Sequence, residues 1–230
     1  MSLFDIFKKS KKNEEPAPQL PQYLYDDSEI EELDSFIADM FGDYKNVFHE
    51  IASPDVHLDV CIVDPTDEEP YYKLVTMGAG AYKMKIPEKW QKYDLDYAEY
   101  VIYLPKEWDI NSGDEKDYWP IKLLKDVARL PIWCDTWLGY GHTTQADEEG
   151  SPYASNTRFN SVILKFAENK KGDIRMIMSS GKVINFYEII PLYPEELRFK
   201  MENDAGALFK KLDEKGIRYR VLDLERESGV

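Results

Sequence analysis

Cysteine, histidine and long apolar runs are scarce in this sequence. It contains two cysteines, Cys61 and Cys134, which lie far apart and form no C-x-x-C pair, and three histidines. No apolar run approaches the roughly 20 residues that a transmembrane helix needs, and no signal peptide is recognisable. We therefore expect a cytoplasmic protein with reduced thiols, without disulfide bonds and not inserted in a membrane.

Basic residues are outnumbered by acidic ones. The chain has 29 lysines and arginines against 44 aspartates and glutamates, which gives a formal net charge of -15. DNA, RNA and anionic membranes bind proteins through local cationic density, so this balance disfavours all three as partners. A basic protein partner is allowed by this charge, and the simpler interpretation is that the acidic residues serve solubility. The 43% hydrophobic content is typical of a globular protein with a substantial core.

The first 22 residues differ in composition from the rest. "MSLFDIFKKSKK" places four large apolar residues beside four lysines, and the Pro-rich "NEEPAPQLPQ" that follows is typical of a linker. We expect a mobile leader and linker over residues 1–22, with a short amphipathic helix that touches a membrane as the alternative. One folded domain is expected over residues 23–230.

Hydrophobic periodicity predicts an α/β (α+β) fold in this domain. Three segments have apolar residues at helical spacing, and Ser28 with Glu31 fits a capping box at the start of the first. Short turns join the predicted strands, and residues 56–78 fit an antiparallel hairpin, so we expect a mixed, largely antiparallel sheet covered by helices. The predicted helices are 26–51, 119–131 (starting at Trp119-Pro120 and ended by Pro131) and 193–216, with Gly42 and Gly206 as candidate interruptions; the predicted strands are 56–63, 71–78, 97–105, 160–166, 173–180, 182–192 and 217–224.

A glycine-rich turn after the hairpin raises the question of a nucleotide site. Gly78-Ala79-Gly80 lacks the third glycine of a dinucleotide fingerprint, because Lys83 occupies that position, and no Walker loop is present. Pro87 interrupts the segment that follows, so no helix N-terminus is placed to receive a phosphate. Gly139-Tyr140-Gly141 likewise has Thr144 at the third position. Both stretches are better interpreted as bends or sites of close backbone approach.

Three side chains with metal-binding or catalytic chemistry alternate along one predicted strand. His57, Asp59 and Cys61 share a strand face, and imidazole, carboxylate and thiolate all bind transition metals. A metal site would need a fourth group, and a Cys–His pair would need an activating environment. Ordinary strand packing is the simpler interpretation, since free cysteine is usually an inert buried residue.

The segment 133–145, "WCDTWLGYGHTTQ", concentrates aromatic and polar side chains in an irregular stretch, a pattern that suits a recognition surface. The alternative is that its tryptophans anchor the loop to the core while His142 satisfies a backbone group. Acidic runs at 67–70 and 147–150 are expected in solvated loops at the rim of such a surface. The candidate contact residues are Trp133, Asp135, Trp137, Tyr140 and His142.

The succession of segments along the chain resembles the Suppressor-of-fused domain family over residues 25–225. "YYKLVTMG", "AEYVIYLP", "WPIKLLKDVARL" and "FYEIIPLYPEEL" follow in the order of that family. Gly80 is a departure, because the family often has a serine shortly after the first glycine. The residues that carry the resemblance are Tyr72, Gly78, Glu99, Trp119, Pro120, Arg129, Gly141 and His142, followed by Glu188, Pro191 and Glu196.

The resemblance implies a compact α/β domain that binds another protein, with no known catalytic activity and no obligatory cofactor. The animal member resembles a two-part regulator that sequesters a transcription factor, and stand-alone bacterial members resemble immunity proteins that neutralise toxins. The leading hypothesis is therefore a bacterial-type domain that masks a protein partner, above all a basic toxin. The alternatives are a regulatory or scaffold domain that binds a peptide segment, and a hydrolase or metal enzyme that uses His57, Asp59, Cys61 or His142.

Overall fold

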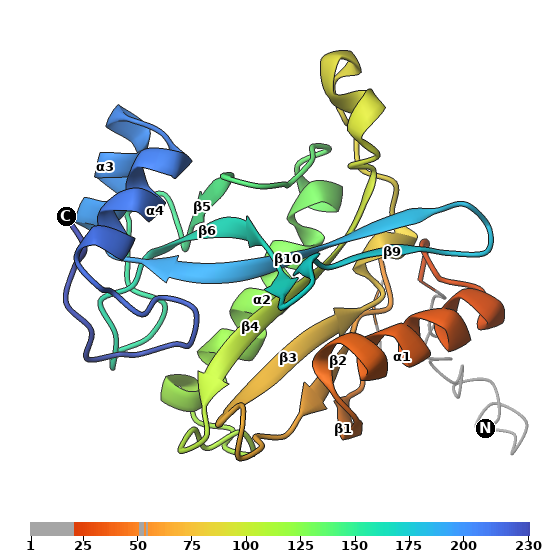
Figure 1. Ribbon diagram of the computed structural model, residues 1–230, viewed down its shortest axis with the longest axis horizontal. Helices are drawn as coiled ribbons and strands as arrows, with labels where there is room; N and C mark the ends of the chain where they lie inside the picture. Colours follow the sequence, from red (N-terminus) through yellow and green to blue (C-terminus); the bar gives the residue numbers. More distant parts are fainter. Residues whose placement is uncertain (1–20, 51–52, 54) are drawn as a thin grey trace, which may run out of the picture.

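An eight-stranded sheet forms the centre of the molecule (Figure 1). The computed structural model describes residues 21–50, 53 and 55–230, so most of the leader and linker predicted over residues 1–22 lies outside the described part. Neighbouring strands are antiparallel except β4 and β10, which are parallel, and the predicted mixed, largely antiparallel sheet is confirmed. The strand order is β1 (Tyr44–Phe48), β2 (Asp59–Val63), β3 (Tyr71–Met77), β4 (Tyr97–Pro105), β10 (Val183–Leu192), β6 (Ser161–Phe166) and β5 (Thr143–Gln145). The eighth strand, β9 (Arg175–Ile177), also pairs with β10. A separate hairpin consists of β7 (Glu168–Asn169) and β8 (Gly172–Asp173).

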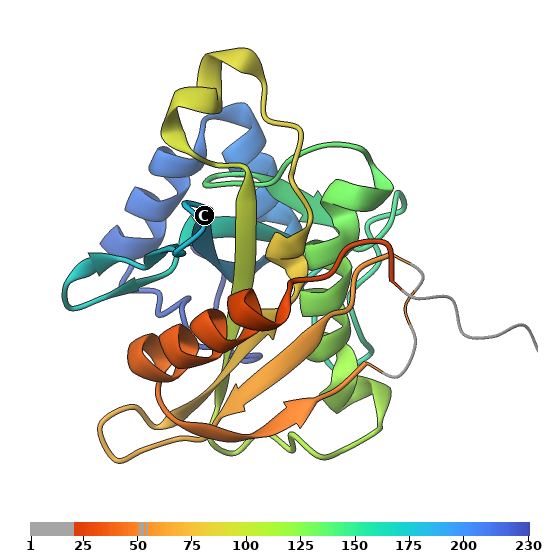
Figure 2. The ribbon, with the colours of Figure 1, turned by 90° about the vertical axis from the view of Figure 1, so that its right-hand side faces the viewer.

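Side chains alternate between the two faces of the central strands. In β3, Leu74 packs into the cluster that contains α2, while its neighbour Val75 packs into the cluster that contains α1. Along β10, Phe186 packs on the α1 side and Leu192 on α4, so α1, α3 and α4 cover one face and α2 covers the other (Figure 2). Each buried Leu or Ile of these layers contributes about 1.5–3 kcal/mol. The helices are α1 (Asp27–Phe41), α2 (Glu115–Trp133), α3 (Pro194–Glu202) and α4 (Ala205–Glu214).

The first helix is shorter than the predicted helix 26–51. It ends at the candidate interruption Gly42, whose φ of +118° is a conformation that favours glycine, and residues 44–48 then form the edge strand β1. The predicted capping box is wrong in its residues, because Asp26 is the N-cap and Glu29 closes the box. The side chain of Ser28 donates to Asp26 instead.

The second helix begins four residues before the predicted start at Trp119-Pro120, at Glu115, and Pro131 lies inside it. A proline inside a helix leaves the carbonyl four residues earlier without its usual donor. For Pro120 that carbonyl belongs to Lys116, and the side-chain amide of Asn156 donates to it at 2.8 Å. This substitute donor, which comes from a distant loop, explains why the proline does not mark the start of the helix.

The C-terminal third also departs from the prediction. The predicted helix 193–216 is divided before the candidate interruption Gly206, because Asp204 caps a new helix by accepting from the backbone of Ala207. The predicted strand 217–224 is wrong: its only ladder contact in the described chain is a single bridge between Val221 and Tyr103. β10 pairs with β4 only as far as Val101, so residues 217–224 find an open edge only at the end of β4, where the bridge to Tyr103 forms. None of the helices in the described residues combines the length and hydrophobicity that crossing a bilayer requires.

Candidate protein-binding surface

The glycine turn after β3 binds a carboxylate of the chain itself. The turn forms a short 3₁₀ helix, η2 (Ala79–Ala81), and its backbone N–H groups lie 3.0–3.3 Å from the side chain of Glu99 on β4. Such successive N–H groups form an anion-binding nest. Glu99 is fully buried and fills this nest, so the turn resembles a phosphate loop in sequence but binds an internal anion. The carboxylate of Glu99 accepts hydrogen bonds from five donors: the backbone N–H groups of Gly78, Ala79 and Gly80 and the hydroxyls of Tyr25 and Thr76.

Close packing around the nest explains both of its glycines. Gly78 has φ +135°, and a Cβ atom there would lie 1.9 Å from the carbonyl oxygen of His57. At Gly80 a Cβ atom would lie 2.2 Å from the hydroxyl oxygen of Tyr25. The space that a serine side chain would need at this position is therefore occupied by Tyr25, which supplies its own hydroxyl to Glu99 at 2.9 Å.

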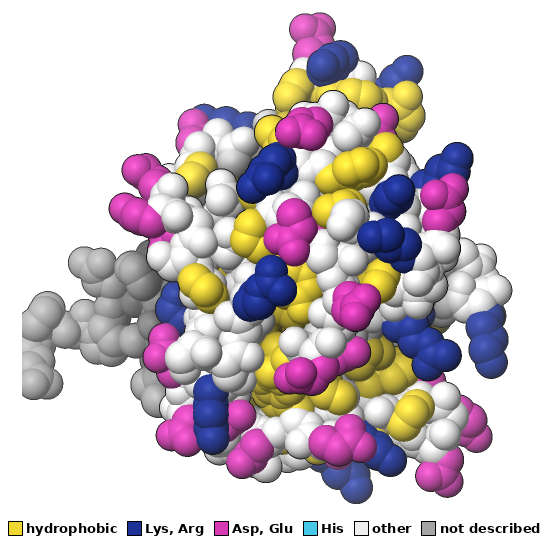
Figure 3. All heavy atoms as spheres, turned by 90° about the vertical axis from the view of Figure 1, so that its left-hand side faces the viewer, with side chains coloured by type: hydrophobic (Ala, Val, Ile, Leu, Met, Phe, Trp, Pro, Cys, Tyr) yellow, Lys and Arg dark blue, Asp and Glu magenta, His cyan; other side chains and the backbone are white. Residues whose placement is uncertain are grey.

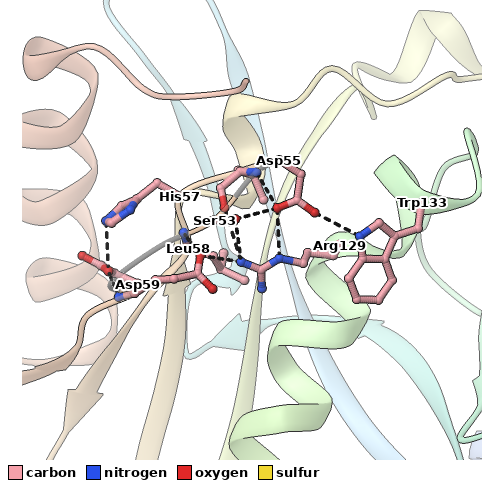
Figure 4. A network of polar contacts seen from close by, with 9 residues as sticks. Ser53, Asp55, His57, Leu58, Asp59, Arg129 and Trp133 are labelled. Atoms are coloured by element: carbon pink, nitrogen blue, oxygen red, sulfur yellow. Dashed lines mark hydrogen bonds and ion pairs between the residues drawn. The ribbon is translucent and has the colours of Figure 1, made fainter. Parts of the chain in front are cut away.

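A second buried network joins α2 to the segment that precedes β2 (Figure 4). Arg129 is only 7% exposed and forms ion pairs with Glu50 and Asp55, the latter at 3.2 Å. It also donates to the hydroxyl of Ser53 and to the carbonyl of Val56. Moving α2 away from these carboxylates would leave the buried charge of Arg129 without a partner, which is strongly destabilising. The network therefore fixes the end of α2 against the sheet.

Two further buried carboxylates are paired with arginines from the C-terminal segment. Glu188 of β10 lies 2.8 Å from Arg220, and Glu196 of α3 forms a two-pronged contact with Arg226 at 2.6 and 2.7 Å. The bidentate pair between Glu196 and Arg226 is of a strong and geometrically specific kind. They fix residues 217–230 to the body of the protein without a strand ladder.

The remaining residues of the family resemblance have packing roles. Trp119 is buried and stacks on Tyr153 with ring centroids 5.5 Å apart, and its neighbour Pro120 is buried beside it in α2. Tyr72 packs against the main core cluster. Gly141 has φ +77°, and a Cβ atom there would approach Ala205 of α4 to 3.0 Å.

The five candidate contact residues do not form one patch. Trp137 and His142 pack edge to face, with ring centroids 4.3 Å apart, and both are half-buried. Burial lowers the pKa of His142. Trp137 and His142 thus pack on each other within the loop, and their contact with a partner stays a prediction.

The other three candidates are exposed and contact different partners. Trp133 is 58% exposed at the end of α2 and donates to Asp55 at 3.0 Å. Asp135 forms a surface ion pair with Lys85. Tyr140 stacks on Phe166, at the other end of the loop, with centroids 5.7 Å apart.

Trp133 lies in a groove between α2 and the edge strand β5. The groove has a volume of about 360 Å³ and is lined on one side by α2 residues such as Leu130 and on the other by Thr144 and Gln145. Tyr153 also lines the groove, and its buried hydroxyl has no hydrogen-bond partner within the described residues. β5 was not predicted from the sequence, because three residues between glycines and an acidic loop are too short for a periodicity signal.

A second exposed aromatic group was also missed. Trp90 and Tyr93 of the 3₁₀ helix η3 (Glu88–Tyr93), which projects at the top of Figure 1, border an apolar cavity of about 280 Å³ together with Phe166. The face of the molecule drawn in Figure 3 places hydrophobic side chains among charges of both signs, without a continuous basic area. The pair of aromatic residues in "EKWQKY" was the available sequence signal.

His57, Asp59 and Cys61 do not form a common site. Asp59 accepts from His49 at 2.9 Å and pairs with His57 at 3.2 Å, whereas Cys61 is buried in the cluster under α1. Burial raises the pKa of the Cys61 thiol to about 12, which removes the thiolate that a nucleophile requires. Over residues 21–50, 53 and 55–230, no three His, Cys, Asp or Glu side chains are grouped so that they could hold a metal ion.

Replacing the nest's anion should destabilise the protein. Burial raises the pKa of Glu99, while the hydrogen-bond donors around the carboxylate lower it. In Glu99→Gln the side-chain amide is itself a donor, so its N–H groups would face the N–H and O–H donors of the nest without an acceptor. We expect the free energy of unfolding in urea to fall by about 2–4 kcal/mol. The control Glu148→Gln, in an exposed loop, should change it by less than about 0.5 kcal/mol. Equal effects of the two substitutions would contradict the role given to Glu99.

The two cysteines should differ in reactivity toward a thiol reagent. At pH 8 a thiol of pKa about 12 is ionised in about one molecule in ten thousand, and Cys61 is also inaccessible. Cys134 is exposed and should be labelled at once, while Cys61 should be labelled only in denaturant. Rapid labelling of both thiols in the native protein would revive the nucleophile hypothesis.

Solved structures share this fold. A SUFU homologue from Neisseria gonorrhoeae superposes with a TM-score of 0.61 at 19% identity, covering 87% of this chain and 96% of that one. A chain of the Sufu–Fu complex superposes with a TM-score of 0.60 at 11% identity, covering 87% and 90%. Drosophila Suppressor of Fused gives a TM-score of 0.54 at 12% identity, and this chain covers half of its length.

Sequence comparisons extend over most of the chain. An uncharacterised protein of Ureaplasma parvum is 20% identical over 218 residues, which are 90% of this chain and 98% of that protein. Trehalase 2 of Sulfolobus acidocaldarius is 24% identical over 156 residues, 61% of this chain but only 26% of the trehalase. The model of the Suppressor of fused protein (SUFU) family matches residues 54–227, which include Glu99 with its glycine turn, Arg129 and β5. The chain belongs to the Suppressor of fused family.

Proposed function

We propose that this protein is a non-catalytic binding module that holds an extended segment of a protein partner against the free edge of β5. The observation that carries the proposal is the position of this edge strand beside a groove that contains an exposed tryptophan. An extended segment can add to an open edge through main-chain hydrogen bonds, while its side chains enter neighbouring pockets. The solved Sufu–Fu complex is a complex between two proteins, which agrees with such a use of the fold.

The register of β5 defines which backbone groups are available. Thr144 pairs with Val162 of β6, and the next ladder bond runs from Ala146 to Asn160 at 2.9 Å. Since hydrogen-bonding groups alternate along an antiparallel pair, the N–H and C=O groups of Thr143 and Gln145 point away from the sheet. These outward groups are the ones that an added strand would use.

The groove beside this edge has the composition of an interaction site. Val127, Leu130 and Trp133 supply apolar surface, while Lys122 and Asp126 form an ion pair at 2.7 Å on α2. The unpartnered Tyr153 hydroxyl would form a hydrogen bond with a polar group that enters the groove. Exposed tryptophans next to small polar pockets are frequent energetic centres of protein interfaces.

We further propose that the partner is a basic bacterial toxin and that the protein acts as its immunity protein in the cytoplasm. The support is the net charge of -15, because many toxins that act on nucleic acid are basic and opposite charges speed association. The alternative partner is a regulatory protein that presents a peptide segment, since β5 would serve both. The identity of the protein that co-purifies from the native organism decides between them: a toxin encoded by a neighbouring gene supports immunity, and any other partner contradicts it.

A proline on the open edge tests the binding mode. In Gln145→Pro the lost N–H points away from β6, so the sheet ladder is kept while strand addition is blocked. We expect the co-purified partner to bind Gln145→Pro about tenfold more weakly and Trp133→Ala about thirtyfold more weakly. The matched control Gln145→Ala should bind like the unchanged protein.

The measurement is the dissociation constant by calorimetry, with the melting temperature of each variant recorded to show that it is folded. Unchanged affinity in both Gln145→Pro and Trp133→Ala would place the partner elsewhere on the molecule.

A further inference from the structure

We propose that the N-terminal segment of the chain, residues 3–12, binds intramolecularly in a groove between α1 and β9. The groove has a volume of about 600 Å³ and is lined by one face of α1, from Ser28 to Asp39, and by Met176 and Ile177. The turn that follows β9 contacts α1 there, because the backbone N–H of Ser179 donates to Glu32 at 2.8 Å.

The floor of the groove is apolar and incompletely covered. Ile177 is 73% exposed, the largest value for any large hydrophobic residue in the described part of the chain. Phe36 of α1 is half-buried beside it and stacks on Phe186 at 5.5 Å. Covering such a residue with another apolar side chain is favourable in proportion to the area removed from water.

The walls of the groove are acidic. Its lining includes three carboxylates and no lysine or arginine. Glu32 is engaged by Ser179, and the nearby Lys182 is already paired with Glu29 at 2.6 Å. Glu31 and Asp39 form no ion pair with any residue that the structure describes. An occupant that fits this groove therefore has apolar side chains for the floor and cations for the walls.

The start of the chain has this chemistry in the right order. Leu3, Phe4, Ile6 and Phe7 precede four lysines at 8, 9, 11 and 12, in a protein whose overall charge is strongly acidic. The described chain begins at Pro21, six residues before α1. Residues 13–20 can span about 30 Å at full extension, whereas α1 is about 22 Å long, so the segment can reach the groove of its own chain.

This binding site is separate from the proposed partner site. The groove lies on the α1 face of the sheet, while the groove beside β5 adjoins α2 on the opposite face. The segment and a partner can therefore be bound at the same time, and failure of one proposal does not imply failure of the other. Since the contact depends on charge, salt should weaken it.

The test is site-specific photo-crosslinking in the full chain. With a benzophenone amino acid in place of Phe7, we expect cross-links within the same chain to residues 28–39 and 175–179, identified by mass spectrometry. In the variant Glu31→Lys/Asp39→Lys the yield should fall about fivefold, because two exposed ion pairs are replaced by repulsion. The control Glu148→Lys/Glu149→Lys has the same change in net charge on a distant loop and should keep the yield.

A second variant protects the test from loss of folding. Lys8→Ser/Lys9→Ser changes only the segment outside the described fold and should also lower the yield about fivefold. Cross-links spread over unrelated surfaces, equal yields in all variants, or links between chains that grow with protein concentration would each overturn the proposal.

Discussion

The buried carboxylate of Glu99 is the interaction on which the arrangement of the N-terminal half depends. It connects β4, the end of β3, the glycine turn and Tyr25, which directly precedes the N-cap of α1. Removing a carboxylate from water costs several kcal/mol, and the five donors offset that cost only when all of them are in place. The position of α1, and with it the groove beside β9, thus follows from the same contact that requires glycine at 78 and 80.

The other buried charges extend this principle to the rest of the molecule. Arg129 fixes the end of α2, and the pairs Glu188–Arg220 and Glu196–Arg226 fix the C-terminal segment against β10 and α3. Several residues that carry the family resemblance are therefore parts of a rigid framework. The open edge of β5 lies outside this framework, while Trp133 in the groove beside it is joined to the framework by its hydrogen bond to Asp55.

The sequence predicted what local periodicity determines. The central strands and the core of α1 and α2 have regular apolar spacing, and they form where expected. The errors arose where distant residues decide. Asn156 supplies the donor that lets Pro120 sit inside α2, and β10 leaves only the end of β4 beyond Val101 open, so residues 217–224 form a single bridge there. The sequence argued correctly against a phosphate-binding loop at the glycine turn. It could not identify Glu99 as the anion that the turn binds, because Glu99 comes from the next strand.

The candidate contact residues of the segment 133–145 stay a prediction, and the structure separates them by their packing. Trp133 lies in the groove beside β5, while Trp137 and His142 pack on each other within the loop. Aromatic residues serve both roles, and only the direction of each side chain separates them. β5 itself is too short for a periodicity signal, although its open edge defines the proposed mode of binding.

Amide hydrogen exchange in the presence of the partner tests the central claim most directly. Thr143 and Gln145 direct their N–H groups away from the sheet, so an added strand would cover them. We expect exchange of these two amides to slow markedly when the partner binds, while that of Thr144, already paired with Val162, changes little. Slowed exchange on another surface, with Thr143 and Gln145 unchanged, would contradict binding at the edge of β5.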